Sequence, residues 1–484
     1  MCYTQSRFNA LLSACVMSLI ATAGWSQQPS LRWLGTLPGG SDSYAYGVSA
    51  DGRVVVGYAY NAAGQARAFC WTASGGMGNL GTLGGDWSEA WGVSADGAVV
   101  VGRAENAIWQ GGEARAFRWT ASGGMQDLGT LGCCDSWAFG VSADGAVVVG
   151  WAYYNATGQW RAFRWTAFGG MQDLGTLGGH RSYAFGVSAD GRVVVGYAQN
   201  AAGQWRAFRW SSLSYSMRDL GVLPGGNQSE AYGVSADGAV VVGWARNYAN
   251  QPRAFRWTAS GGMQDLGVLP GGNQSGAYGV SANGAVVVGW SYNNSNQPRA
   301  FRWENGVMQD LGALPGGNRS EAYGVSANGA VVVGWSYNNA GNERAFRWTA
   351  SGGMEDLGTL PGYDRSWAYA VSADGAVVVG RAINDAVEDN CAVRWTASGI
   401  EDLNTTYASL LRGSALWEAR AISPDGRYIV GKGYNAATHR IEPFLLDTRG
   451  NNTLCTLDGD VNGDGIVDDA DLLEVLFNFG SQCP

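Results

Sequence analysis

Residues 233–244 read Gly-Val-Ser-Ala-Asp-Gly-Ala-Val-Val-Val-Gly-Trp, two short runs of β-forming residues joined by Asp237-Gly238. This pattern predicts a β-hairpin, because Asp-Gly accepts the positive φ angles of tight hairpin turns. The hexapeptide, or a close variant with Asn for Asp or Ala for the first Gly, occurs eight times before a Val-Val-Val-Gly run, and a looser ninth copy spans residues 422–426. The chain is therefore a repeat protein.

Each repeat contains four β-rich runs, which predicts one antiparallel sheet per repeat. In the fifth repeat the third run is 253–257, and a Ser-Gly-Gly turn leads into a fourth run over 263–269. The fourth runs start at Leu34, Leu80, Leu128, Leu174, Leu220, Leu266, Leu311 and Leu357, with a degenerate start at Leu403. Such a period is typical of propeller blades or helical arrays, and the β character favours blades. We expect residues 27–447 to form an all-β propeller of about eight to nine blades from nine repeats of ~46 residues.

The two ends of the repeat region predict how the propeller closes. Residues 32–37 match the end of a third run plus a fourth run, and the last repeat stops after the third run at 444–446. The first strand is therefore expected to complete the last blade, which would remove exposed sheet edges. Within the second run, Val240 and Val242 are expected to point to one face and Val241 to the other, because side chains alternate along a strand. Both faces are apolar, as stacked blades require.

Composition and the N-terminus restrict the functional classes. A net charge of −9, with no basic run, argues against nucleic-acid binding. Residues 1–26 read as a secretory signal peptide, with an apolar stretch from Ala10 to Ala23 that is too short to span a membrane. Leu12-Ser13-Ala14-Cys15 also matches a lipoprotein cleavage motif. We expect an exported protein, extracellular or on the cell surface, with no transmembrane segment and a monomeric state.

A calcium loop of the EF-hand type is predicted near the C-terminus, after a linker at 448–457. Oxygen ligands recur at the spacing that Ca²⁺ requires, and a glycine permits the sharp turn. The predicted ligands are Asp460, Asn462, Asp464, Ile466 through its carbonyl, Asp468 through water, and Asp471. Cys455 and Cys483 bracket this segment and are the expected disulfide pair; Cys70, Cys133, Cys134 and Cys391 are left open.

Two resemblances follow from these motifs. Residues 458–479 resemble one half of a dockerin, which implies calcium binding and a cohesin-like protein partner, although dockerins carry two loop-helix copies and this chain has one. We therefore delimit a single dockerin-like segment at 458–484. Residues 32–447 resemble the HAF-type extracellular repeat family through the Arg-Ala-Phe-Arg-Trp motif at 206–210 and the hexapeptide at 233–238. That resemblance implies export and a repeat architecture, without a mechanism.

Aromatic residues between the second and third strands are the candidate ligand contacts. Their faces suit stacking on sugar rings, which would make a polysaccharide the ligand, but the sequence favours packing of most of these rings against neighbouring loops. The candidates are Trp109, Tyr154, Trp160, Trp205 and Tyr248. The repeated arginines, such as Arg253 and Arg256, are expected to neutralise the Asp before the fourth strand or to lie over a Trp, with recognition of acidic polysaccharides as the alternative.

The sequence favours a secreted, non-catalytic propeller that acts as a binding or scaffold module, attached through its calcium segment. The alternative is a carbohydrate-active enzyme, a glycoside hydrolase, or an accessory protein of polysaccharide breakdown. Exceptional acids for that chemistry are Glu105 and, in the eighth repeat, Asp385, Glu388 and Asp389. Paired carboxylates can hydrolyse a glycosidic bond only at suitable separation, which sequence does not show.

Overall fold

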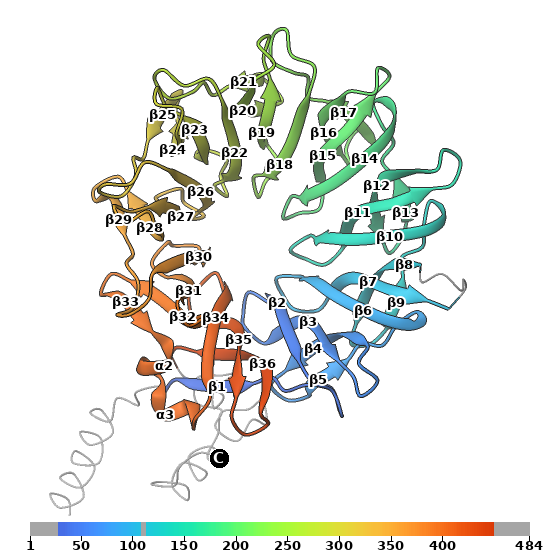
Figure 1. Ribbon diagram of the computed structural model, residues 1–484. Helices are drawn as coiled ribbons and strands as arrows, with labels where there is room; N and C mark the ends of the chain where they lie inside the picture. The colour runs from blue at the N-terminus through green and yellow to red at the C-terminus, as the bar shows by residue number, and fades with distance from the viewer. Residues whose placement is uncertain (1–27, 108–112, 450–484) are drawn as a thin grey trace, which may run out of the picture. The chain divides into compact units, whose positions relative to one another are not determined.

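The described residues form nine four-stranded antiparallel sheets arranged as a ring (Figure 1). The computed structural model describes residues 28–107 and 113–449, and Leu31–Leu446 make one compact unit. The fold is an all-β, nine-bladed β-propeller, which confirms the predicted fold class and fixes the blade number at nine. No helix in the described ranges is both long and apolar enough to cross a membrane.

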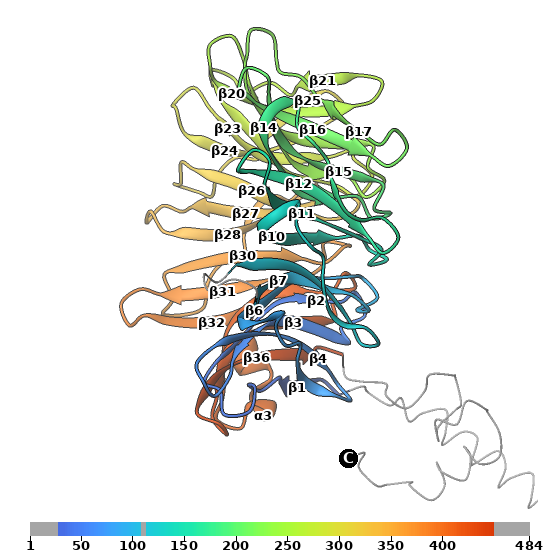
Figure 2. The same ribbon diagram turned by 90° about the vertical axis from the view of Figure 1, so that its right-hand side faces the viewer.

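The strands of each blade run outward from the centre of the ring in chain order, except that the outermost strand of blade nine comes from the N-terminal side of the chain (Figures 1 and 2). The inner strands are β2 (Ser43–Val48), β6 (Gly84–Val93), β10 (Gly132–Val141), β14 (Gly178–Val187), β18 (Ser229–Val234), β22 (Ser275–Val280), β26 (Ser320–Val325), β30 (Arg365–Val371) and β34 (Ala415–Ile422). The second strands are β3 (Val54–Tyr60), β7 (Val100–Asn106), β11 (Val147–Tyr154), β15 (Val193–Asn200), β19 (Val240–Arg246), β23 (Val287–Tyr292), β27 (Val331–Tyr337), β31 (Val378–Asn384) and β35 (Tyr428–Asn435). The third strands are β4 (Ala66–Thr72), β8 (Ala114–Thr120), β12 (Gln159–Thr166), β16 (Trp205–Ser211), β20 (Pro252–Thr258), β24 (Pro298–Glu304), β28 (Glu343–Thr349), β32 (Asp389–Thr396) and β36 (Arg440–Asp447). The outer strands are β5 (Gly76–Asn79), β9 (Gly124–Asp127), β13 (Gly170–Asp173), β17 (Ser216–Asp219), β21 (Gly262–Asp265), β25 (Val307–Asp310), β29 (Gly353–Asp356), β33 (Gly399–Asp402) and β1 (Ser30–Trp33).

The ring closes as the sequence predicts. Strand β1, from the N-terminal side, pairs with β36 and completes the ninth blade, whose other strands come from the C-terminal side of the chain. An apolar cluster containing Leu37 and Val55 of blade one and Val430 and Leu445 of blade nine fills this interface. Two short helices, α2 (Leu403–Thr406) and α3 (Ala408–Leu411), lie between blades eight and nine and have no counterpart in the predicted repeat.

The core consists of apolar clusters between neighbouring blades. Val240 and Val242 pack toward blade six, whereas Val241 and Ala245 pack toward blade four, which confirms the predicted alternation. Burying such side chains contributes about 1.5–3 kcal/mol each. The second strand of each blade packs with both of its faces. One Val-Val-Val run therefore contributes to the interfaces with both neighbouring blades.

The outer strands are shorter than the sequence predicts. In blade five the fourth strand ends at Asp265, not at Leu269. The Asp265 side chain accepts a hydrogen bond from the N–H of Gly267 at 2.8 Å, and Gly267 has a φ of 86°. This turn ends the strand, because a carboxylate that bonds to the backbone two residues on competes with the sheet. Leu266 and Leu269 are buried beyond the strand and serve the interface instead.

The Asp-Gly hairpin also differs from the expected turn. Only Gly238 has a positive φ, of 70°, whereas Asp237 does not. The Asp237 carboxylate accepts hydrogen bonds from the Ser235 hydroxyl at 2.6 Å and the Ala239 N–H at 3.0 Å. Both bonds lower the pKa of Asp237, the serine bond having the larger effect. The repeat therefore requires Asp or Asn here as a hydrogen-bond acceptor, not for its backbone conformation.

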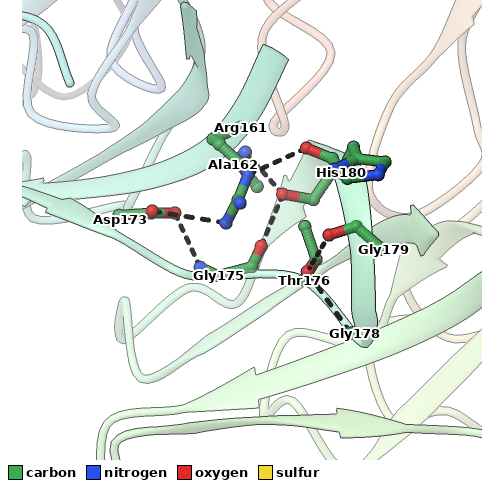
Figure 3. A network of polar contacts seen from close by, with 9 residues as sticks. Arg161, Ala162, Asp173, Gly175, Thr176, Gly178, Gly179 and His180 are labelled. Carbon is green, nitrogen blue, oxygen red and sulfur yellow. Dashed lines mark hydrogen bonds and ion pairs between the residues drawn. The ribbon is translucent and has the colours of Figure 1, made fainter. Parts of the chain in front are cut away.

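A buried serine links most neighbouring blades. The Ser229 hydroxyl donates to the carbonyl oxygen of Gly221 at 2.6 Å and accepts from the Ala207 N–H of the preceding blade at 2.9 Å. Figure 3 shows another link between blades, in which Arg161 contacts Asp173 of its own blade and the carbonyl oxygen of His180 in the next.

A second link is a chain of backbone hydrogen bonds between the hairpins. The alanine N–H of one blade donates to the carbonyl oxygen of the alanine in the next, as from Ala236 to Ala282 at 3.0 Å. In blade nine the hairpin alanine is replaced by Pro424. The third-strand alanine, whose N–H bonds to the buried serine of the next blade elsewhere in the ring, is replaced by Pro443. Proline has no N–H, so neither bond can form across the interface of blades nine and one, which we call the seam.

Candidate ligand-binding site

The inner strand of every blade contains a β-bulge at the same place. In blade four, Ala184 pairs with Gly196 and Gly186 pairs with Val195, so Phe185 is an extra residue without a partner on β15. A bulge turns a side chain away from the regular alternation of its strand. The sequence marks this residue only as the aromatic of a Ser-x-Ala-aromatic-Gly segment.

The nine bulge residues form one set, which we call the bulge ring. It consists of Tyr46, Trp91, Phe139, Phe185, Tyr232, Tyr278, Tyr323, Tyr369 and Arg420. Eight members are aromatic and one is cationic. They lie on the strands closest to the centre of the ring (Figure 1).

Several members of the bulge ring are exposed to solvent. Tyr46, Phe185, Tyr232, Tyr278 and Tyr323 have 36–51% of their surface accessible, whereas the aromatic residues of the third strands, such as Phe255, are buried. Large apolar side chains clustered on a surface indicate an interaction site more often than single ones do. The repeat therefore presents aromatic faces on its inner wall.

The bulge residues contact aromatics on the second strands, and these contacts continue from blade to blade. Trp91 stacks on Phe139 at 4.8 Å between ring centroids, and Phe139 stacks on Trp151 at 4.0 Å. Trp151 then meets Phe185 of the next blade at 5.3 Å. Tyr278 and Tyr323 form a similar pair at 5.5 Å. Such contacts hold the rings in fixed orientations, which suits a preformed surface.

The tyrosines of this surface stay neutral through the physiological range. Burial, together with Glu230, raises the pKa of Tyr232, and burial raises the pKa of Tyr323 to about 12. Each hydroxyl donates to a carboxylate, Tyr232 to Glu230 at 2.6 Å and Tyr323 to Glu321 at 3.0 Å. Burial also raises the pKa of Glu321. The inner wall thus combines flat rings with hydrogen-bonding groups.

Two hollows open beside the bulge ring. One, of about 370 Å³, lies between blades seven and eight and is lined by Tyr323, Trp335, Trp367, Tyr369, Glu343 and backbone. The other, of about 230 Å³, lies at the seam and is lined by Tyr44, Tyr46, Tyr58, Glu418, Arg420, Lys432 and backbone. Both are of a size that accepts one small ring of a ligand.

Two of the aromatics predicted from the sequence extend this surface. Trp160 lies 5.4 Å from Trp137, and Trp205 lies 5.1 Å from Tyr197, measured between ring centroids. Tyr154 is instead covered by the guanidinium of Arg161 at 4.8 Å. These side chains therefore pack on neighbours, as the sequence favours, and Trp160 and Trp205 do so next to the bulge ring.

The remaining predicted residues fall elsewhere. Tyr248 is 84% exposed in the loop between β19 and β20, away from any described aromatic contact. Trp109 lies outside the described residues, as do the six predicted calcium ligands and Cys455 and Cys483. Cys70, Cys133, Cys134 and Cys391 are free thiols. Within the described ranges, no cluster of three His, Cys, Asp or Glu side chains is arranged to hold a metal.

The repeated arginines have the structural roles that the sequence favours. Arg253 forms an ion pair with Asp265 at 3.4 Å, and Arg256 lies over Trp303 of the next blade at 5.7 Å. The prediction was wrong only in placing the Asp before the outer strand, because it is the last residue of that strand. These arginines hold the outer parts of the blades together.

The acids considered for catalysis lie at the ends of second and third strands or in the turn between them. Asp385 forms an ion pair with Arg365, and Asp389 accepts a hydrogen bond from Tyr363 at 2.6 Å. Glu388 lies in the turn between β31 and β32 with a φ of 53°. Glu105 is in another blade and accepts from the Asp86 N–H. Each acid has its own local partner or turn, and none lies on the inner wall.

Comparison with known proteins relates the chain to others through its fold. No family model and no curated protein matches it. The structure is similar to dipeptidyl peptidase 4 from Porphyromonas gingivalis, with a TM-score of 0.51 and 10% identity over 83% of this chain and 65% of that one. It also matches a prolyl endopeptidase, with a TM-score of 0.42 and 12% identity over 74% of this chain and 55% of that one. TolB from Acinetobacter baumannii matches with a TM-score of 0.29 and 14% identity over 45% of this chain and 51% of that one. The chain spans 65% of the length of the peptidase, and the shared feature is the β-propeller fold alone.

Proposed function

We propose that this protein is an exported, non-catalytic binding module that holds a polysaccharide chain on its bulge ring. The observation that carries the proposal is the repeated exposure of an aromatic residue at an inner-strand bulge, from Tyr46 to Tyr323. Aromatic faces stack on sugar rings, and the adjacent Tyr and Glu groups can bond to sugar hydroxyls. The resemblance to HAF-type extracellular repeats agrees with export and adds no activity.

The experiment is retention of the protein on insoluble polysaccharides, with released sugar assayed in parallel. The Tyr278→Ala/Tyr323→Ala double variant should lose at least about tenfold in affinity, because stacked rings each contribute on the order of 1 kcal/mol. Tyr248→Ala removes a more exposed ring outside the bulge ring and serves as the control. If the double variant is retained as well as the Tyr248→Ala control, the proposal is wrong. Sugar release would favour the glycoside hydrolase alternative.

We further propose that residues 458–479 bind Ca²⁺ as a dockerin-like segment and attach the propeller to a cohesin-like protein. This rests on the ligand spacing of the sequence, from Asp460 to Asp471. Calorimetric titration of the full chain with Ca²⁺ should show one site that Asp464→Ala abolishes and Asp86→Ala preserves. Unchanged calcium uptake in the Asp464 variant would refute the assignment.

A further inference from the structure

The hollow at the seam differs from the rest of the inner wall in its charge. Blade one contributes Tyr44, Tyr46 and Tyr58, and blade nine contributes Glu418, Arg420 and Lys432. Arg420 is the bulge residue of its blade and the only cation in the bulge ring. At this point the repeated aromatic is replaced by a guanidinium that faces three tyrosines across the seam.

The cations here outnumber the carboxylates. Glu418 is 1% exposed and contacts Arg420 at 2.6 Å, Arg381 at 3.4 Å and Lys432 at 3.5 Å. One carboxylate against three cations leaves an excess of two positive charges, and Asp42, which lies near Tyr44 of blade one, reduces this local excess to one. Glu89, which lies near Tyr46, is itself paired with Arg103 at 3.0 Å and does not offset this excess. The chain as a whole has a net charge of −9.

The cationic groups remain accessible to a ligand. The Arg420 side chain is 45% exposed and the Lys432 side chain 28% exposed. Arg420 also lies over the ring of Tyr369 at 5.4 Å, and Lys432 over that of Tyr44 at 5.3 Å, so both are held in place. Tyr44 and Tyr58 stack at 5.0 Å and form a flat wall beside them. Fixed cations next to flat rings suit a ring that carries an anionic group.

We infer that the seam hollow binds an anionic sugar residue, with its ring against Tyr46 and Tyr58 and its acidic group on Arg420 and Lys432. This inference rests on the proposed polysaccharide-binding function and specifies its ligand class. The shared chemistry is an anionic substituent, a carboxylate or a sulfate. Charge-assisted hydrogen bonds to a buried or half-buried cation are about twice as strong as neutral ones, so the anionic residue fixes the register of the chain.

The test is calorimetric titration of the full chain, in calcium-free buffer, with polygalacturonate and with its methyl ester. The two polymers share the same sugar backbone, and the ester replaces each carboxylate with a neutral methyl ester. We expect polygalacturonate to bind at least about tenfold more tightly, as two charge-assisted contacts predict. Dextran sulfate against dextran tests the sulfate in the same way, and a preference for either anionic polymer through the same residues supports the inference.

Arg420→Gln/Lys432→Gln should abolish this preference while binding to the methyl ester remains. The matched control is Arg53→Gln/Arg192→Gln, which removes the same charge from hairpins where each arginine pairs with its own Asp. Lys432→Gln alone provides a second variant in which Glu418 keeps both arginines, and thermal unfolding checks that each variant folds. If the control loses the preference equally, or if charged and neutral polymers bind alike, the inference is wrong. Equal binding leaves the proposed function standing, whereas no binding to any polymer overturns both.

Discussion

At the scale of single residues, a few positions separate the structural role of the repeat from its proposed binding role. The buried serine and the hairpin Asp hold each blade to itself or to the next, so they recur with little change. The bulge residue touches no core cluster, and it varies from Tyr to Trp, Phe and Arg. The backbone of the bulge is the same in each blade while its side chain varies. The proposed ligand surface can therefore differ from blade to blade.

The buried serine should matter for stability. Ser229→Ala removes the acceptor of the Ala207 N–H, which is buried, and the donor to the Gly221 carbonyl, which is half-buried. Leaving such groups without partners costs about 1–3 kcal/mol. Urea unfolding should show this loss, and Ser216→Ala on exposed β17 should stay within about 0.5 kcal/mol of the parent. A parent-like midpoint for Ser229→Ala would contradict the assigned role.

The carboxylate of Glu321 should destabilise the fold at neutral pH. Burial raises its pKa above the ordinary 4.5, so the folded state binds the proton more tightly than the unfolded state does. Its favourable contribution is therefore complete below pH 4.5 and is lost as pH rises through the raised value. Glu321→Gln should raise the unfolding temperature at pH 7 and have little effect near pH 4. Glu355→Gln, at an exposed outer-strand site, should show no such pH dependence.

At the scale of elements, the bulge depends on a glycine in the second strand. A Cβ on Gly57 would lie 1.9 Å from the carbonyl oxygen of Tyr44, so the inner strand approaches too closely for any side chain. The glycine that ends each Val-Val-Val-Gly run thus allows the close approach of the inner strand at the bulge.

Gly57→Ala should therefore destabilise blade one by about 1–3 kcal/mol and move Tyr46, because overpacked sites shift their backbone. Gly78→Ala in β5 of the same blade is the control, since other repeats have Gln or Arg there. Thermal unfolding and the affinity for the retained polysaccharide would be measured together. Unchanged values for Gly57→Ala would show that the close approach is not required.

At the scale of the whole molecule, we predict that the seam is the weakest interface of the ring. Pro424 and Pro443 remove two inter-blade hydrogen bonds, each of which contributes about 0.5–1.5 kcal/mol. Native-state hydrogen exchange should therefore be faster in 43–60 and 415–447 than in the equivalent segments of blade five. Pro424→Ala should restore a donor to Ala50 and slow this exchange. Uniform exchange around the ring would show that β1 alone is enough to secure closure.

The sequence predicts the blade and its closure well, because the strands, the hairpin and the completing strand β1 all follow from local patterns. It does not reveal the bulge, since Phe185 is an extra residue only relative to its partner strand. The seam hollow is hidden for the same reason, because Tyr46 and Arg420 lie far apart in the chain. The loop aromatics are candidates on sequence because their faces suit stacking on sugars, but contacts between blades are not visible there, and Tyr154 proves to be covered by Arg161.

The account depends most on the inner wall as the place where the ligand binds. Hydrogen-exchange mass spectrometry of the full chain, with and without the polysaccharide that it retains most strongly, tests this directly. We predict protection of inner-strand peptides, above all those of β2, β26, β30 and β34, with none in the 247–251 loop. Protection confined to that loop and its equivalents on the outer side, with unchanged exchange in the inner strands, would contradict the account.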